Sequence, residues 1–330
     1  MEEKKHRNNL IDIVRMFCAI LVVGIHTRPF DSLDSTNLVR AIEKLNSIAV
    51  PMFLVIAGAF FWKKVEKTGI KYAKKYLRRI VTMYIFWSAI YAVYTYCVYY
   101  DFNTLSSFMK LLICQLMYYG TYLHLWYFVC VIYCVILSIF ALHCFKVSSV
   151  CRYIFPFFFL LYIVFYFVLG QQLPMEAKRI LCNMPFFFLG TYTFSQNTKN
   201  HKHTVVLLYV SLVGLILEWS YIYIGYYPFS LFVFLPCLIR YMNLNEIVGL
   251  HLNWLGNYAR ITSSIMYSSH FLIILLLERV FDSSRGDLNF FITIVVELIL
   301  GLLLSKCKWK GLKYIIWNLR WVYNWCLVKR

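Results

Sequence analysis

Residues 12–26 read DIVRMFCAILVVGIH, which predicts an apolar helix with Asp12 and Arg15 near its start and His26 at its end. Ionisable side chains at membrane depth are costly and rare, so each one in an apolar segment is a candidate functional residue. Arg15 and His26 are eleven residues apart, about 1100° of helical rotation, which places both side chains on one face. At ~1.5 Å rise per residue they lie roughly 16 Å apart along the axis. One helix face therefore presents a fixed cation and a titratable imidazole at two depths.

The composition predicts an all-α, polytopic membrane protein. Hydrophobic residues make up 61% of the 330 residues and charged residues 15%, and a soluble domain cannot bury that much apolar surface. Long continuous apolar runs favour helices over the short alternating strands of a membrane barrel. The formal net charge of +18 fits the Lys and Arg that collect in cytoplasmic loops. We therefore expect the lipid bilayer, and no nucleic acid, as a partner.

Apolar runs predict about ten transmembrane helices. They cover residues 10–27, 46–62, 79–99, 123–142, 153–169, 180–195, 204–224, 227–242, 262–281 and 288–305. With the N-terminus inside, the inner segments hold most of the Lys and Arg, which predicts cytoplasmic termini and a multi-pass protein of the plasma membrane. A further apolar piece, 107–119, is too short to span comfortably and is interpreted as a re-entrant or interfacial helix.

The last residues, 306–330, differ from the predicted transmembrane domain 1–305. Here Trp317, Trp321 and Trp325 are spaced four apart among Lys and Arg residues, so they form one stripe of a helix. Such a stripe is typical of an amphipathic helix on the inner membrane surface. A linker toward a further domain is the alternative interpretation of this basic, Trp-rich tail.

The first predicted helix carries a candidate catalytic group and a candidate anion-binding group. Two arginines at the boundary of the third predicted span could add to the anion site. His26 can act as general base on an alcohol or amine, or can simply hydrogen-bond between helices. Arg15 can bind phosphate or carboxylate in bidentate fashion, and Asp12, three residues earlier, can orient it or form an internal ion pair. Arg78 and Arg79 adjoin the third predicted span, and we expect them to extend a cationic mouth that faces the cytosol.

Four more polar groups lie in or beside apolar runs. His124 opens the fourth predicted span with Trp126 beside it, a pattern of either a substrate-binding site or an aromatic belt at the membrane surface. His270, Glu218 and Glu297 lie at membrane depth, where a buried carboxylate needs a partner or a proton. The sequence does not pair them, and His124, Trp126, His270 and Glu218 are retained as candidate binding residues.

The sequence motifs of several other kinds of site are absent from the chain. The chain has no nucleotide or dinucleotide loop and no G-x-S-x-G elbow, which argues against a serine hydrolase. Most of the eleven cysteines lie inside apolar runs, where they behave as small hydrophobes. Cys130 and Cys134 are one turn apart with no His or acidic pair near them. We expect no metal site and no tightly bound cofactor.

The motif Asp12-x-x-Arg15-x10-His26 on a first span resembles the signature of the acyltransferase-3 family of integral membrane proteins. Later stretches are similar to that family in the same order. They are PMFLVIAGAFF (51–61), KKYLRRI (74–80), HLWYF (124–128), MPFFFLG (184–190) and WLGNYARITSSIMYSSH (254–270). The resemblance covers nearly the whole chain, and the family is expected to have ten spans.

This resemblance implies transfer of an acyl group, often acetyl, from cytoplasmic acyl-CoA as co-substrate. Arg15 and the Arg78–Arg79 pair would lie near the donor's phosphates, and His26 would act at the outer face on a hydroxyl of a sugar or cell-envelope polymer. The chain departs from the family at Ala57, where a small polar residue is usual before the glycine, and lacks the proline that often follows the second arginine of that pair.

A subgroup of the same superfamily offers an alternative. The chain resembles the membrane half of the vancomycin-resistance-type membrane serine racemases, which precedes a cytoplasmic racemase domain and is associated with supplying L-serine to it. The short basic N-terminus and the Trp-rich tail suit such a fusion. In this alternative Arg15 pairs with the carboxylate of L-serine, and the 330 residues form a membrane domain that precedes a soluble enzyme.

Overall fold

A computed structural model shows that every described secondary-structure element is a helix, which confirms the all-α prediction. The structure describes residues 9–31, 36–99, 115–117, 120–169, 174–193, 201–221, 227–244, 250–281 and 286–306. The first helices are α1 (Asn9–Thr27), α2 (Thr36–Ser47), α3 (Ala49–Thr68), α4 (Ile70–Tyr99), the short η2 (Leu123–Leu125) and α6 (Trp126–Cys144). The later ones are α7 (Val147–Val164), η3 (Phe165–Leu169), α8 (Met175–Leu189), η4 (Gly190–Tyr192), α9 (His201–Tyr221), α10 (Leu231–Leu244), α11 (Leu250–Val280) and α12 (Gly286–Lys306).

Eight segments of the described chain are long and apolar enough to cross a membrane. They are α1, α2 with α3, α4, η2 with α6, α7 with η3, α9, α11 and α12. The two other predicted spans, 180–195 and 227–242, coincide with the shorter helices α8 and α10. The chain is therefore a polytopic helical membrane protein. The predicted tail, apart from Lys306, and most of the piece 107–119 lie outside the described residues.

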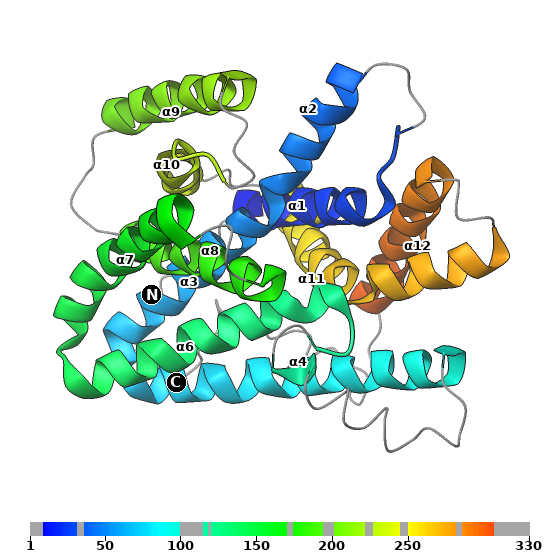
Figure 1. The fold of residues 1–330 in the computed structure, drawn as a ribbon, viewed down its shortest axis with the longest axis horizontal. Coiled ribbons are helices and arrows are strands. Elements are labelled where there is room, and N and C mark those ends of the chain that lie inside the picture. The colour runs from blue at the N-terminus through cyan, green and yellow to red at the C-terminus, as the bar shows by residue number, and fades with distance from the viewer. Residues whose placement is uncertain are drawn as a thin grey trace. The chain divides into compact units, whose positions relative to one another are not determined.

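The chain divides into two compact units, and the first combines residues 1–53 with residues 238–330. Its central feature is the pair α1 and α11 (Figure 1). The Asn9 amide donates to Asn253 Oδ1 at 2.7 Å, across 244 positions of sequence. At the other end, the rings of His26 and His270, which are the same number of positions apart, lie 5.2 Å from centroid to centroid. Because the offset is equal at both ends, α1 and α11 run parallel.

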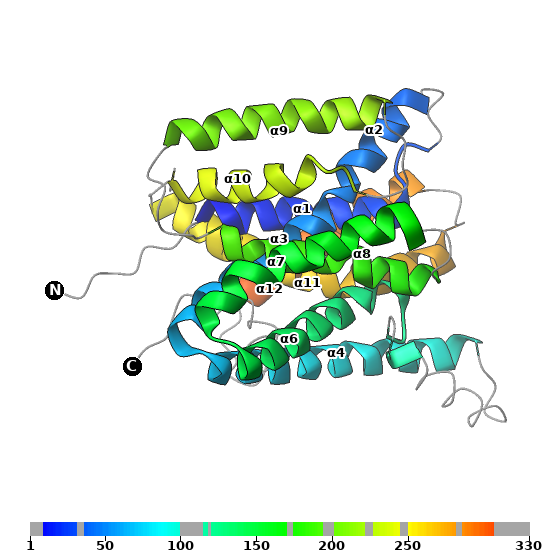
Figure 2. The same ribbon diagram turned by 60° about the vertical axis from the view of Figure 1, so that its left-hand side comes forward.

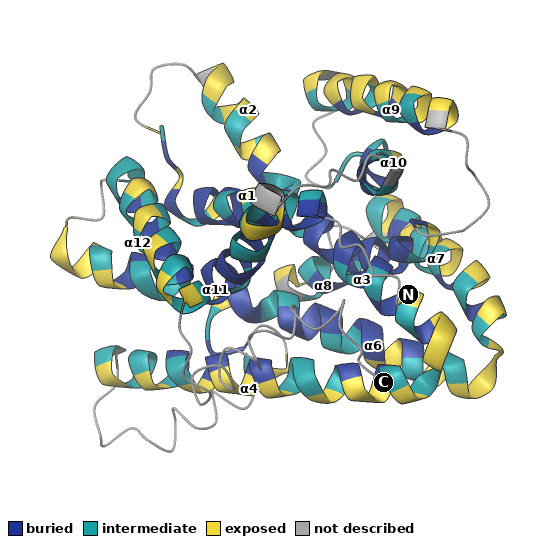
Figure 3. Ribbon diagram, turned by 180° about the vertical axis from the view of Figure 1, so that it is seen from behind, coloured by how far each residue is buried: buried dark blue, intermediate teal, exposed yellow. Residues whose placement is uncertain are grey.

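Helix α12 carries its polar residues inward and its apolar residues outward. The buried stripe consists of Asn289, Thr293, Glu297 and Gly301. The stripe of exposed side chains, 52–59% accessible, consists of Phe291, Val295, Ile299 and Leu303. Both stripes repeat every four residues, and this is the reverse of the pattern of a helix on a soluble protein. Figure 3 shows the exposed face of α12, which is suited to contact lipid.

In the second unit, residues 54–237, the backbones of α3 and of the end of α8 approach each other closely. A Cβ added to Gly58 would lie 1.8 Å from the backbone oxygen of Phe187, and one added to Gly190 would lie 2.2 Å from the nitrogen of Ala59. Small residues allow such close approach of membrane helices. Two of the stretches that resemble the acyltransferase family, 51–61 and 184–190, therefore meet here.

Other helices of the second unit lie side by side or present apolar faces. Helices α4 and α6 pack along each other (Figure 1). Helix α9 lies beside α10 (Figure 2), and only 17% of the apolar part of α9 is buried. An apolar helix with so little buried surface fits a lipid environment, because lipid contact replaces the missing protein contact.

The basic run between the second and third predicted spans is helical, which corrects the predicted span boundary at residue 79. Helix α3 continues to Thr68 and α4 begins at Ile70. Gly69 between them has φ +63°, and its N–H donates to the Val65 carbonyl at 2.7 Å. A glycine in the left-handed region commonly ends a helix. Cationic side chains reduce hydropathy without breaking a helix. The length of an apolar run is therefore shorter than the length of the helix that contains it.

Candidate functional site

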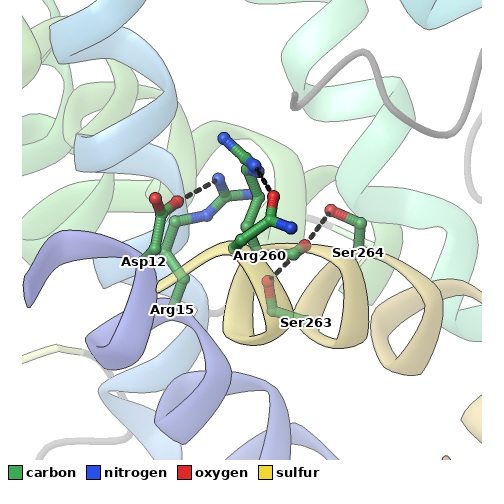
Figure 4. A network of polar contacts seen from close by, with 6 residues as sticks. Asp12, Arg15, Arg260, Ser263 and Ser264 are labelled. Carbon is green, nitrogen blue, oxygen red and sulfur yellow. Dashed lines mark hydrogen bonds and ion pairs between the residues drawn. The ribbon is translucent and has the colours of Figure 1, made fainter. Parts of the chain in front are cut away.

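Polar side chains of α1 and α11 form a cluster near the end of α1 that is predicted to be cytoplasmic. This group, here called the guanidinium cluster, consists of Asp12, Arg15, Asn257 and Arg260. Arg15 Nη1 lies 3.8 Å from Asp12 Oδ1, an ion pair one turn long. Arg260 Nη2 donates a hydrogen bond to Asn257 Oδ1. Asp12 is 7% exposed and Arg260 only 4%. Figure 4 shows the side chains of Arg15 and Arg260 projecting to the same side of their helices.

The parallel register of α1 and α11 explains why Arg260 joins this cluster. The offset of 244 positions places Arg15 opposite residue 259. Gly256 permits the close approach, since a Cβ there would lie 2.5 Å from Asn9 Oδ1. The ninth apolar run was predicted at 262–281, which left Arg260 outside the predicted span. Helix α11 starts at Leu250, so Arg260 lies inside the helix.

The serine hydroxyls of α11 lie within hydrogen-bonding distance of backbone carbonyls of their own helix. Ser263 Oγ and Ser264 Oγ both donate to the Arg260 carbonyl, at 3.1 and 2.9 Å. Ser269 Oγ lies 2.8 Å from the Ile265 carbonyl. Hydroxyls that donate to a carbonyl three or four residues earlier satisfy their own polarity. This explains how a serine-rich sequence forms a membrane-spanning helix.

An imidazole pair, His26 and His270, lies at the C-terminal end of α1 and about two-thirds of the way along α11. Their ring planes are inclined by 34°, and Phe271 meets His26 edge-on with a centroid distance of 4.9 Å. His270 is fully buried, with Nδ1 2.7 Å from the Met266 carbonyl oxygen. A carbonyl only accepts hydrogen bonds, so Nδ1 carries the proton and Nε2 of neutral His270 is an acceptor. The sequence predicted both histidines and the structure brings them together.

Each end of the site thus receives residues from both helices. Eleven residues separate Arg15 from His26 on α1, and ten separate Arg260 from His270 on α11. At ~1.5 Å rise per residue the guanidinium cluster and the imidazole pair are roughly 15–16 Å apart along the helices. The predicted placement of a cation and an imidazole at two depths on α1 is matched by a second set of the same groups on α11.

Glu297 has a partner that the sequence did not reveal. Its Oε1 lies 2.6 Å from Ser269 Oγ, which belongs to the residue before His270. Glu297 is fully buried, and its Oε2 has no hydrogen-bond partner among the described residues. The carboxyl group therefore joins α12 to α11 at the turn that carries the imidazole pair.

The other candidates from sequence lie in the second unit. His124 is 2% exposed, and its ring centroid lies 4.6 Å from that of Tyr91 in an edge-on arrangement. Trp126 begins α6 and is partly exposed. On α4, Arg78 is exposed and Arg79 is partly buried. Their roles in donor or substrate binding stay predictions.

Glu218, the remaining candidate, contacts the start of α10. Its Oε1 accepts hydrogen bonds from the Ser230 backbone N–H at 3.1 Å and from Ser230 Oγ at 2.6 Å. Ser230 directly precedes α10, and a negative charge is favourable near the N-terminus of a helix. The contact gives this carboxylate a helix-capping function, whatever else it binds.

The fold and the site define a polytopic helical membrane protein with buried or partly buried guanidinium and imidazole groups on two parallel helices. The family model of the acyltransferase domain of acyltransferase 3 matches residues 8–306, and the chain belongs to this family.

A similar curated protein is an amino-acid racemase of Enterococcus faecalis. It is 32% identical over 138 residues, a match that covers 38% of this chain and 18% of the racemase. The chain thus matches less than a fifth of that relative's length. No solved structure matches the chain.

Proposed function

We propose that the protein is a plasma-membrane acyltransferase, with both termini cytoplasmic, that moves an acyl group such as acetyl from cytoplasmic acyl-CoA to a cell-envelope hydroxyl at the outer face. The observation that carries this proposal is the separation of roughly 16 Å between Arg15 and His26. The pantetheine arm of coenzyme A has about 13 bonds between phosphate and sulfur, or ~16 Å at ~1.2 Å per bond of extended chain. A donor with its phosphates at Arg15 therefore places its thioester at His26.

His26 serves as the general base in this proposal. The acceptor hydroxyl attacks the thioester carbonyl while His26 takes its proton. The C–S bond then breaks, the coenzyme A thiolate leaves, and His26 returns the proton to the sulfur, so that the products are an ester and free coenzyme A. Asp12 orients Arg15, and Arg78 and Arg79 are further candidates for binding the donor's phosphates. Family membership supports this reaction class.

The test is transfer of label from [14C]acetyl-CoA to an envelope fraction by membranes that contain the protein. His26→Ala is expected to abolish incorporation while the protein still inserts and keeps its thermal stability. His143→Ala is the matched control, because His143 is exposed and its Nδ1 lies 2.8 Å from the Ile139 carbonyl of its own helix. Transfer at the wild-type rate by His26→Ala refutes the role of His26, and absence of transfer by the wild type refutes the proposed reaction.

A second function is favoured by the match to the amino-acid racemase. In it the chain delivers L-serine to a fused or associated cytoplasmic racemase domain, as in vancomycin resistance, and Arg15 binds the serine carboxylate. Proteoliposomes that contain the protein should then accumulate labelled L-serine, with Arg15→Gln inactive. Accumulation no higher than in empty vesicles refutes this alternative.

A further inference from the structure

We propose that Arg260 is the second half of the donor site, and that Arg15 and Arg260 together bind the diphosphate of the acyl donor. This inference rests on the proposed acyltransferase function and deepens it. It assigns to α11 a binding residue that the Asp12–His26 motif of α1 does not contain. The paired site takes a ligand with two adjacent phosphate groups.

The helix register puts the two guanidinium groups at one depth. Contacts at both ends fix the alignment of α1 with α11, through Asn9 with Asn253 and through His26 with His270. Within this alignment Arg260 is one position from the residue opposite Arg15. Figure 4 shows the two side chains projecting together from the two helices.

The charges of the guanidinium cluster favour an anion. Two guanidinium groups and one carboxylate meet there, and Arg260 donates to Asn257, a neutral amide. Arg260 is 4% exposed, so its charge is held away from bulk water and its interaction with an anion is strengthened. Each guanidinium presents a planar fork that binds phosphate oxygens in bidentate fashion.

Two forks distinguish a diphosphate from a carboxylate. A single arginine satisfies the two oxygens of an amino-acid carboxylate. Two arginines at one depth match the two phosphorus centres of a diphosphate, with one fork for each phosphate. The distance of roughly 15 Å from Arg260 to His270 also matches the pantetheine arm, so this anchor keeps the thioester at the imidazole pair.

The experiment compares two donors with the purified protein in lipid vesicles. Arg260→Gln is expected to raise KM for acetyl-CoA roughly tenfold to a hundredfold, the usual effect of losing a charged hydrogen bond, with kcat little changed. S-Acetylpantetheine lacks the diphosphate, so its kcat/KM should be the same in wild type and variant. Arg260→Lys keeps the positive charge without the planar fork, so its KM for acetyl-CoA should lie between those of the wild type and Arg260→Gln. Arg279→Gln on the exposed last turn of α11 is the matched control.

An unchanged KM for acetyl-CoA, or equal losses with both donors, overturns the inference. Calorimetric titration of the purified protein with coenzyme A and with inorganic pyrophosphate tests the site without any reaction. Binding to the wild type that is lost in Arg260→Gln supports the site even if no acyl transfer is found, which separates it from the proposed function. Binding of L-serine but not of pyrophosphate, abolished in the same variant, overturns the assignment of a diphosphate.

Discussion

Replacing Gly58 with Ala should destabilise the protein, although helix propensity alone predicts the opposite sign. An alanine inside a helix is favoured over glycine by about 1 kcal/mol. At Gly58, however, the new Cβ would lie 1.8 Å from the Phe187 carbonyl oxygen and 2.8 Å from its carbon, whereas ordinary contact begins near 3.4 Å. The obstacle is backbone, so no side-chain rotation relieves it. Helix α3 and the end of α8 must therefore separate by about 1.6 Å, the difference between 1.8 and 3.4 Å.

The cost of that separation exceeds the gain in propensity. A gap of ~0.5–1 Å already removes a quarter to a half of the dispersion energy across a contact, and overpacking typically costs about 1–3 kcal/mol. Because backbone obstructs backbone, the upper end of that range applies, and the net loss is about 2 kcal/mol. At ~2–4 °C for each kcal/mol, Tm should fall by roughly 4–8 °C. Size-exclusion profiles of heated, detergent-purified protein measure this shift.

Gly190 supplies an internal control for the same contact. Its added Cβ would lie 2.2 Å from the Ala59 nitrogen and 2.4 Å from the carbon of Gly58, so Gly190→Ala should lower Tm as well. The double variant should lose less than the sum of the two single variants, because the first substitution already opens the gap. A rise in Tm for Gly58→Ala, or strict additivity of the pair, would contradict this account of the contact.

Two further predictions concern the carboxyl groups of Glu297 and Glu218. Glu297→Gln keeps an acceptor within reach of Ser269 and should change stability by less than about 1 kcal/mol; Glu297→Ala leaves a void at a fully buried position and should cost about 2 kcal/mol. Equal Tm values for Glu297→Gln and Glu297→Ala would be evidence against a role of the Glu297 side chain in joining α12 to α11. Glu218→Ala removes the acceptor of both Ser230 hydrogen bonds and should cost about 1.5–3 kcal/mol, against about half for Ser230→Ala. An unchanged Tm for Glu218→Ala would show that the contact does not stabilise α10.

The sequence was sufficient for features that depend on local periodicity. Apolar runs located eight membrane-crossing segments and two shorter helices, and helical rotation placed Arg15 and His26 on one face of α1. It also identified the family through stretches that the structure brings into contact, such as those with Gly58 and Gly190. Orientation in the membrane stays a prediction from the distribution of Lys and Arg.

Sequence periodicity could not predict which residues of different helices pair with each other. His270 lies 244 positions from His26, and Ser269 lies 28 positions from Glu297, so each pairing depends on how helices pack. Arg260 was missed for a different reason, because polar residues at 253–260 reduce the hydropathy of a segment that is nevertheless helical. Within that segment Gly256 lies close against Asn9, since an added Cβ would be 2.5 Å from Asn9 Oδ1. The sequence feature that could have identified Arg260 is its position shortly before Ser263 and Ser264 in one continuous helix.

The two proposed functions make different use of the distance between the guanidinium cluster and the imidazole pair. One amino acid spans at most ~3.6 Å, so L-serine held by Arg15 cannot reach His26 roughly 16 Å away. Serine binding at Arg15 should therefore survive His26→Ala. An acyl-CoA donor contacts both ends at once, so the same substitution should stop transfer without releasing the donor's phosphates. The combined effect of His26→Ala on binding and on turnover thus separates a transferase from a serine-delivery domain, because only a transferase needs both ends of the helix pair for one molecule.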